Sequence, residues 1–180
     1  AWIRERVPAA ETELAGKVAG VSELLDHTVG SMRRISAELR PLMLDDLGLA
    51  DAAAWLVDDF AERSGVDCRL DLPRDGSLDA LDKPVATAVY RVLQESLTNI
   101  GKHARATHAW VVVAREPEGL RLDIEDDGAG IPDDRLTGTR SLGLKGMRER
   151  VLYLGGTVQI SRAPRGGTRV AARFPLKVAP

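Results

Sequence analysis

The sequence predicts an α+β fold: a two-layer sandwich in which about five mostly antiparallel strands lie under helices, preceded by a long helix. Three observations lead to this expectation. Apolar residues recur at helical spacing before Gly65, they alternate with polar residues in several short segments after it, and two further helical patterns interrupt those segments.

The composition is typical of one globular domain with an added helical element. The chain has 180 residues, of which 44% are hydrophobic and 29% are charged. Its formal net charge is −2 and no long run carries one sign, so we expect no nucleic-acid partner. Cys68 is the only cysteine, which excludes an internal disulfide and favours a reducing compartment. The sequence has neither a bilayer-spanning apolar run nor a signal-peptide layout, so we expect a soluble piece without membrane contact.

The first expected helix carries a coiled-coil pattern. Eight positions from Leu14 to Leu39 are spaced alternately four and three residues apart, and seven of them are apolar. An amphipathic helix packed on the chain's own core explains the pattern equally well. Pro41 ends or bends this helix, and a second helix is expected over about residues 49–63, closed by Gly65 in a left-handed cap.

Five later segments have strand patterns. Three alternate apolar and polar residues, a fourth alternates less regularly, and one is continuously apolar. They cover residues 66–72, 109–114, 120–126, 157–161 and 168–174. The turn signals "REPEG" and "APRGG" precede the third and the fifth segment, so antiparallel pairing is expected there.

Two helices are expected between these strands. The first runs from about residue 84 to 102 and begins at Asp82 as its N-cap, with Pro84 in the first turn. The second covers about residues 144–154 and ends at the glycine pair 155–156.

The helix over residues 84–102 presents two polar side chains beside its apolar stripe. Glu95 and Asn99 are one turn apart at the edge of that stripe, and burying either without a partner would cost about 1 to 3 kcal/mol. Two oxygen donors at this spacing suit Mg²⁺, which completes its shell with water and substrate phosphates. A hydrogen bond between the two side chains is the alternative, and it is favoured when the pair is considered alone. The stripe consists of Val85, Ala88, Val89, Val92, Ser96 and Ile100.

Two glycine-rich stretches suggest a ligand. In "DIEDDGAGIP", Asp126 ends a strand and is followed by Gly128 and Gly130, so a carboxylate lies beside backbone that another molecule can approach. Such an acid can accept a hydrogen bond from the amino group of adenine, whereas the carbonyl of guanine would repel it. In "SLGLKGMRER", Gly143 and Gly146 lie at a helix start, where free backbone amides favour phosphate. Each stretch alone is common in loops.

The order of four segments resembles a known family. "RVLQESLTNIGKHA", "DIEDDGAGIP", "SLGLKGMRERVLYLGGTVQI" and "GGTRVAARFPL" resemble the N box, the two glycine boxes and the closing strand of the histidine-kinase ATP-binding domain. That domain belongs to the GHKL class and has the Bergerat ATP-binding fold. "LRPLMLDDLGLADA" and "LKGMRERV" further resemble the subfamily of sensor kinases serving response regulators of the LuxR and NarL kind. The resemblance covers about residues 39–176.

The resemblance implies roles for single residues. It assigns Asn99 to Mg²⁺ and Glu95 to the reacting end of ATP, where it orients or activates the nucleophile. Lys102 and His103 would face the phosphates, although basic groups also complement a helix C-terminus. Asp126 would read the adenine.

The resemblance also implies how the nucleotide is enclosed. Gly128 and Gly130 would be the hinge of a lid over residues 129–142, and Thr168 would support adenine through water. Ser141 departs from the family, which often has glycine there. The phosphate cradle would consist of the backbone amides of Gly143, Leu144, Lys145, Gly146 and Met147.

The implied function is autophosphorylation. ATP would give its γ-phosphate to a histidine on a dimerisation helix of a homodimer in the bacterial cytoplasm, for transfer to a response regulator of the LuxR or NarL type. None of the three histidines, His27, His103 and His108, fits as this acceptor, so we expect it outside this chain. Residues 1–45 are then a remnant of the dimerisation and phosphoacceptor hairpin, and residues 46–180 are the ATP-binding catalytic domain.

Two alternatives remain at this point. A related GHKL serine kinase of the anti-sigma class would use the same nucleotide motifs but needs no hairpin. A non-enzymatic coiled-coil interaction module would not bind nucleotide.

Overall fold

The structure, a computed structural model, describes residues 42–131 and 142–176. The chain divides into two units, Ala1–Leu42 and Met43–Pro180, and the description below concerns the second. The expected coiled-coil helix over residues 14–39 lies outside the described residues.

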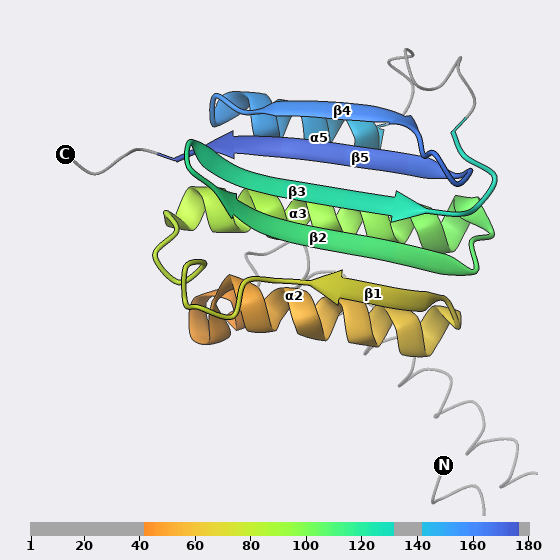
Figure 1. Cartoon of the computed structure of the whole chain (residues 1–180), viewed down its shortest axis with the longest axis horizontal. Helices are drawn as coiled ribbons and strands as arrows, with labels where there is room; N and C mark the ends of the chain where they lie inside the picture. The colour runs from red at the N-terminus through yellow and green to blue at the C-terminus, as the bar shows by residue number, and fades with distance from the viewer. Residues whose placement is uncertain (1–41, 132–141, 177–180) are drawn as a thin grey trace, which may run out of the picture. The chain divides into compact units, whose positions relative to one another are not determined.

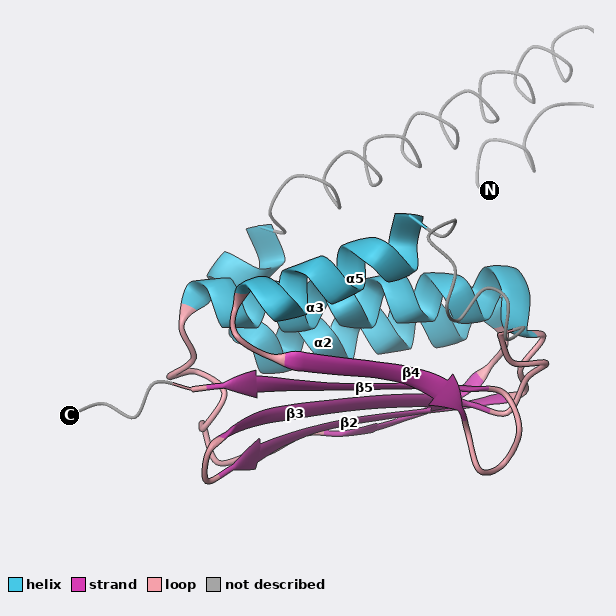
Figure 2. Cartoon of the chain, turned by 90° about the horizontal axis from the view of Figure 1, so that it is seen from above, coloured by secondary structure: helices cyan, strands magenta, loops and turns pink. Residues whose placement is uncertain are grey.

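The described residues form a two-layer α+β sandwich, which confirms the predicted fold (Figure 1). Its elements are α2 (Leu42–Ser64), β1 (Asp67–Asp71), α3 (Lys83–Asn99), a π-helix (Ile100–Ala104), β2 (His108–Glu116), β3 (Gly119–Asp126), α5 (Leu142–Tyr153), β4 (Thr157–Arg162) and β5 (Thr168–Pro175). The strand order is β1-β2-β3-β5-β4. All five expected strands are present, and the three helices lie on one face of the sheet (Figure 2).

Among the described residues, one pair of neighbouring strands in the sheet is parallel. β1 and β2 run in the same direction, while the other three pairs are antiparallel. The parallel pair is possible because α3 carries the chain back along the sheet between the two strands, whereas β2 and β3 are joined by a tight turn.

The helix-facing side of the sheet forms the core. Ile124 of β3 lies between Val111 of β2 and Val170 of β5 in the strand register, and all three side chains are buried. Phe174 near the end of β5 is 1% exposed and pairs with Leu120. The period of two therefore places every second strand residue against the helices.

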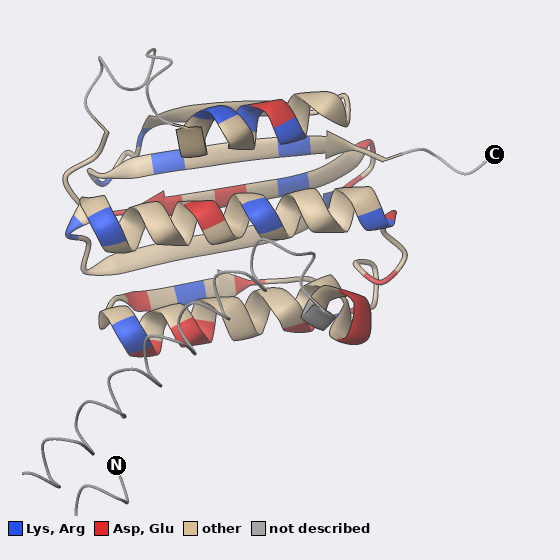
Figure 3. Cartoon of the chain, turned by 180° about the vertical axis from the view of Figure 1, so that it is seen from behind, with Lys and Arg blue, Asp and Glu red and all other residues tan. Residues whose placement is uncertain are grey.

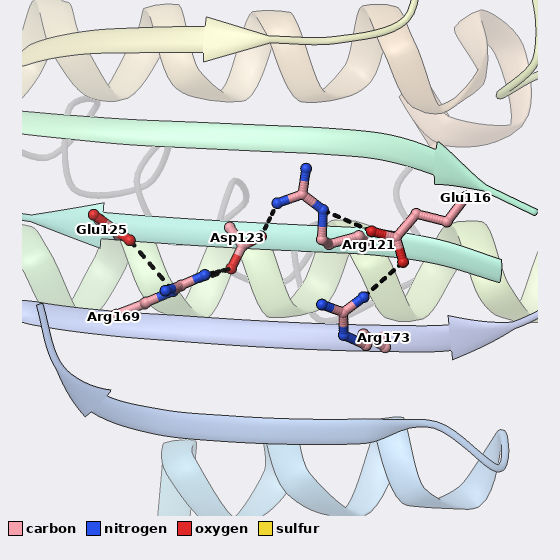
Figure 4. A network of polar contacts seen from close by, with 6 residues as sticks. All are labelled: Glu116, Arg121, Asp123, Glu125, Arg169 and Arg173. Atoms are coloured by element: carbon pink, nitrogen blue, oxygen red, sulfur yellow. Dashed lines mark hydrogen bonds and ion pairs between the residues drawn. The ribbon is translucent and has the colours of Figure 1, made fainter. Parts of the chain in front are cut away.

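The other side of the sheet is polar and carries an ion-pair network (Figure 4). Asp123 accepts hydrogen bonds from Arg121 and Arg169, both at 2.7 Å. Its side chain is almost fully buried beneath these arginines. Arg173 contacts Glu116 at 2.6 Å in a more exposed position. The helical layer seen from outside carries both signs of charge, with acidic residues prevailing along α2 (Figure 3).

Glycine shapes α2. Gly48 has φ of 78° and ψ of 175°, a backbone conformation that is essentially restricted to glycine, so α2 consists of two helical segments. The longer segment matches the helix expected over residues 49–63. It ends as expected at Gly65, which has φ of 72° and donates to the carbonyl of Ala61. None of the helices among the residues described here is long and apolar enough to cross a bilayer.

The beginning of α3 differs from the prediction in one respect. Asp82 occupies the N-cap position and Pro84 follows in the first turn, but the Asp82 side chain makes no capping hydrogen bond. Its carbonyl instead accepts from the amide of Ala86. All six residues of the predicted apolar stripe are buried.

Cys68 provides a test of the packing of β1 against the helices. Its thiol is half-buried, and burial, with smaller contributions from the carboxylates of Asp67 and Asp58, raises its pKa to about 11. Because the thiolate is the reactive form, we expect alkylation by iodoacetamide at pH 8 to be about 100-fold slower than in urea-unfolded protein. Mass spectrometry over time measures the rate, and reduced glutathione in both solvents controls for the reagent. Equal rates in the two solvents would contradict the packed position of this strand.

Candidate functional site

The candidate site lies at one end of the sheet, where β3 ends and β2 and β5 begin. Asp126 is the last residue of β3, and Thr168 is the first residue of β5. The π-helix ends beside them at Ala104, whose carbonyl accepts from the amide of Ala129 at 2.8 Å. Segments that are far apart in the sequence therefore meet around the Asp126 carboxylate.

Asp126 is a buried carboxylate, 2% exposed, without an ion-pair partner among the residues the structure describes. Its Oδ1 accepts from the amide of Gly128 at 2.9 Å and its Oδ2 from the amide of Thr168 at 3.2 Å. Loss of hydration raises its pKa above the usual carboxyl value, and the hydrogen bonds from Gly128 and Thr168 oppose that rise. A carboxylate offers about four acceptor positions, so these amides leave capacity for a ligand N–H group.

Around Asp126, three glycines pack closely against the backbone of neighbouring segments. A β-carbon at Gly128 would overlap the carbonyl oxygen of Ala104, and one at Gly167 would overlap the carbonyl oxygen of Asp126. Gly130, with φ of 76°, approaches the carbonyl of Gly167. Sequence reasoning explained Gly128 and Gly130 by the approach of a ligand, whereas here they approach the chain's own backbone. It did not single out Gly167, although "APRGG" was interpreted as a turn signal.

Glu95 and Asn99 lie together on α3, as predicted. Asn99 donates from Nδ2 to Oε1 of Glu95 at 3.3 Å, which is the hydrogen bond that the sequence left as an alternative. Glu95 also reaches the beginning of α5, because a β-carbon at Gly143 would overlap its Oε1. The structure thus brings the carboxylate, the carboxamide and the amino end of a helix together.

The remaining predicted residues are spread more widely. Lys102 and His103 are exposed on the π-helix, whereas Leu144 and Met147 are buried in the core. The Met147 sulfur accepts a hydrogen bond from Ser96 at 3.7 Å, which joins α5 to α3.

The expected phosphate cradle depends on where α5 begins. The helix starts at Leu142, so helical geometry directs the amides of Gly146 and Met147 to carbonyls one turn earlier. The backbone amides that remain free to bind an anion are therefore those of the first turn of α5. Lys145 is exposed and lies 3.6 Å from Glu149. Most of the expected lid lies in residues 132–141, outside the described residues.

Comparison with known proteins identifies the family. Residues 85–178 match the family of histidine kinase-, DNA gyrase B- and HSP90-like ATPases. The chain belongs to this ATPase family. The match begins in α3 and includes every site residue described above.

Relatives of this ATPase family member are sensor kinases. The chain is 36% identical to the sensor histidine kinase MctS of Rhizobium johnstonii over 83% of its own length and 32% of MctS. It is 41% identical to the signal transduction histidine-protein kinase/phosphatase UhpB of Salmonella typhimurium over 82% of its own length and 28% of UhpB. The chain therefore spans about a third of the length of these relatives.

Solved structures agree with the ATPase fold. The ATP-binding domain of PrrB from Mycobacterium tuberculosis superposes with a TM-score of 0.53 at 25% identity, covering 69% of this chain and 91% of PrrB. The histidine kinase domain from the Erythrobacter litoralis EL346 blue-light activated histidine kinase has a TM-score of 0.64 at 23% identity, and the match covers 98% of this chain and 92% of that one. At this identity the similarity is evidence for the fold and not for the function.

The site of this ATPase family member offers carboxylate and carboxamide oxygens to a ligand. Asp126 has acceptor capacity, and Glu95 and Asn99 supply oxygens near the beginning of α5. Among residues 42–131 and 142–176, no group of three His, Cys, Asp or Glu side chains is placed to hold a metal ion. A magnesium ion here would depend on phosphate and water oxygens for most of its shell, as Mg²⁺ commonly does.

One residue beside the site was missed by sequence reasoning. Asp127 follows Asp126, and its carboxylate accepts hydrogen bonds from the amide and hydroxyl of Thr107 and from the amide of His108, and lies 2.9 Å from the ring Nδ1 of His108. The partners are about twenty residues away in the sequence, where the neighbouring strand β2 begins. No local spacing pattern marks such a cluster.

Proposed function

We propose that this chain binds ATP with Mg²⁺ and is the catalytic region of a two-component sensor histidine kinase. The observation that carries the proposal is Asp126: a buried carboxylate with acceptor capacity, at the position that the family resemblance assigns to adenine recognition. The relatives reported above are named histidine kinases, so a serine kinase of the anti-sigma class or a coiled-coil module is not favoured.

Asp126 and Thr168 hold the adenine in this proposal. The ionised carboxylate accepts from the amino group of the base, and Thr168 supports the contact through water. Guanine presents a carbonyl oxygen at the same place, which the carboxylate repels. The site therefore selects adenine through a single acceptor.

Glu95 and Asn99 act at the other end of the nucleotide. Asn99 supplies an oxygen to Mg²⁺, and Glu95 orients the attacking imidazole or accepts its proton. The bound magnesium nucleotide supplies the phosphoryl group and neutralises its charge. The hydrogen bond to Glu95 uses the Asn99 Nδ2 and therefore leaves the Asn99 Oδ1 available to the metal ion.

The phosphates are enclosed by the remaining residues. Lys102 and His103 face them, Gly128 and Gly130 are the hinge of the lid, and Gly143 allows the first turn of α5 to approach. The exposure of the two basic side chains agrees with contact to a ligand.

The proposal extends to the whole protein. The acceptor histidine lies outside this chain on the dimerisation helix of a cytoplasmic homodimer, and the phosphate passes to a response regulator of the LuxR or NarL type. Residues 46–180 form the catalytic domain, and residues 1–45 belong to the hairpin.

Nucleotide binding tests the proposal directly. We expect wild-type protein to bind Mg²⁺-ATP at least about tenfold more tightly than Mg²⁺-GTP, and Asp126→Asn to weaken ATP binding about 10- to 100-fold, since a charge-assisted hydrogen bond is replaced by an amide that presents N–H to the base. Titration calorimetry measures the four affinities. Asp75→Asn is a matched control, because Asp75 accepts from Ser77 in the connection between β1 and α3, at the opposite end of the sheet. Equal affinities for ATP and GTP in the wild type would refute the role of Asp126.

A further inference from the structure

The Asp127 carboxylate bridges the ends of two strands. Its Oδ1 accepts from the amides of Thr107 and His108 at 2.8 and 2.9 Å. Its Oδ2 accepts from the Thr107 hydroxyl at 2.7 Å and lies 2.9 Å from Nδ1 of His108. These contacts, led by the His108 amide and the Thr107 hydroxyl, hold the pKa of Asp127 well below its usual range.

The bridge continues the pairing of β2 and β3 beyond its last register pair. That pair is Ala109 with Asp126, and the amide of Asp127 donates to the carbonyl of His108 at 3.3 Å. The side chain of Asp127 then binds the two residues that precede Ala109. The end of β3 is thereby fixed to the start of β2 by both backbone and side chain.

Aromatic and charged groups around His108 support the bridge. The His108 ring stacks on Trp110, with centroids 5.8 Å apart and planes inclined by 15°. The guanidinium of Arg165, from the turn between β4 and β5, lies 4.9 Å from the centre of the Trp110 ring. Asp67 of β1 lies 3.9 Å from Nε2 of His108. The Trp110 ring thus lies between His108 of the bridge and the turn that leads to Thr168.

The bridge fixes the backbone on which Asp126 depends. Asp126 is oriented by the amides of Gly128 and Thr168, and Gly128 lies immediately beyond Asp127. Gly128 and Ala129 pack on the carbonyl of Ala104, just upstream of Thr107. Loosening Asp127 would therefore let the Gly128 amide move away from the Asp126 carboxylate.

We propose that Asp127 is a positioning residue that holds the Asp126 carboxylate in the orientation that selects adenine over guanine. The inference rests on the proposed nucleotide site. Asp127 does not contact the base itself. Replacing a residue that only stabilises the fold would weaken the binding of ATP and of GTP by the same factor. Replacing a residue that orients Asp126 would change the ratio of the two affinities.

The test compares ATP and GTP affinities by calorimetry in wild type, Asp127→Ala and Asp127→Asn. For Asp127→Ala we expect ATP binding to weaken about tenfold while GTP binding changes less than about threefold, because only adenine uses the Asp126 acceptor. Asparagine keeps a carbonyl oxygen for the two backbone amides, so Asp127→Asn should retain the wild-type ratio within about threefold. Hydrogen exchange should show faster exchange at Gly128 and Ala129 in Asp127→Ala alone.

A milder variant and a control variant complete the test of the positioning role. If Asp127→Ala does not fold, Thr107→Val removes only the hydroxyl donor and should lower the ATP-to-GTP preference about two- to threefold. Asp75→Ala removes an exposed carboxylate with local hydrogen bonds to Ser77 and should leave the ratio unchanged.

The possible failures can be told apart. An unchanged ratio in Asp127→Ala, even with reduced stability, would overturn the positioning role while the proposed function stands. A wild type that binds ATP and GTP equally would refute the adenine-selecting role of Asp126 and this inference with it, and a wild type that binds neither nucleotide would overturn the proposed function itself.

Discussion

Replacing Gly167 with alanine is expected to lower ATP affinity at least about 100-fold, which corresponds to about 2.7 kcal/mol. Gly167 has φ of 75°, where a β-carbon costs about 1 to 2 kcal/mol in strain. The β-carbon would also overlap the carbonyl oxygen and the Oδ1 of Asp126, so the turn between β4 and β5 must shift. That shift moves the Thr168 amide away from Asp126 and disrupts the adenine acceptor.

Gly65→Ala is the matched control for this experiment. Gly65 has nearly the same backbone conformation, with φ of 72°, but no heavy atom lies within 4 Å of a β-carbon placed there. We expect it to lose only about 1 to 2 kcal/mol of stability and to keep its ATP affinity. Calorimetry and urea unfolding measure the two quantities. Wild-type ATP binding by Gly167→Ala would show that the contact with Asp126 does not shape the site.

Replacing Phe174 with alanine is expected to have the largest effect on stability, about 3 to 5 kcal/mol. Phe174 is among the largest fully buried side chains and packs between the sheet and the helices. Its removal leaves a cavity whose walls belong to strands and helices that cannot all collapse into it. Urea unfolding monitored by circular dichroism measures the change in the free energy of unfolding.

The neighbouring residue controls for the strand itself. Arg173 is on the opposite face of β5, with 61% of its side chain exposed and an ion pair to Glu116. Exposed pairs contribute about 0 to 1 kcal/mol, so Arg173→Ala should be nearly neutral. Losses of equal size in the two variants would mean that the helix-facing side is not the core.

The strands and their faces could be predicted because alternation is a local property. Ile124 and Asp123 are neighbours in sequence, and their opposite environments follow from the period of two. The parallel direction of β1 could not be predicted in the same way, since β1 has the alternating pattern that is typical of an antiparallel strand. The short helical segment over residues 42–47 was not predicted, although the helix expected from residue 49 begins directly after Gly48, where the structure has its break.

The candidate site was only partly visible in the sequence. Glu95 and Asn99 were placed together correctly, since one helical turn separates them. Asp126 was identified by its position before two glycines. The partners of Asp127 were not, because Thr107 and His108 reach it through strand pairing rather than through local spacing. Long-range register depends on the whole sheet, and a local pattern does not contain it.

The π-helix that follows α3 limits how the chain can vary in length. Residues Ile100–Ala104 close wider turns than an α-helix, so this segment holds one more residue than an α-helical path would need. Deleting one residue would restore α-helical turns and leave the Ala104 carbonyl facing the Ala129 amide, whereas each further deletion or insertion would rotate that carbonyl by about 100°. In an alignment of homologues, the stretch from Asn99 to Ala104 should therefore vary by no more than that one residue, while insertions and deletions should be frequent between β1 and α3, where no site residue depends on the number of residues.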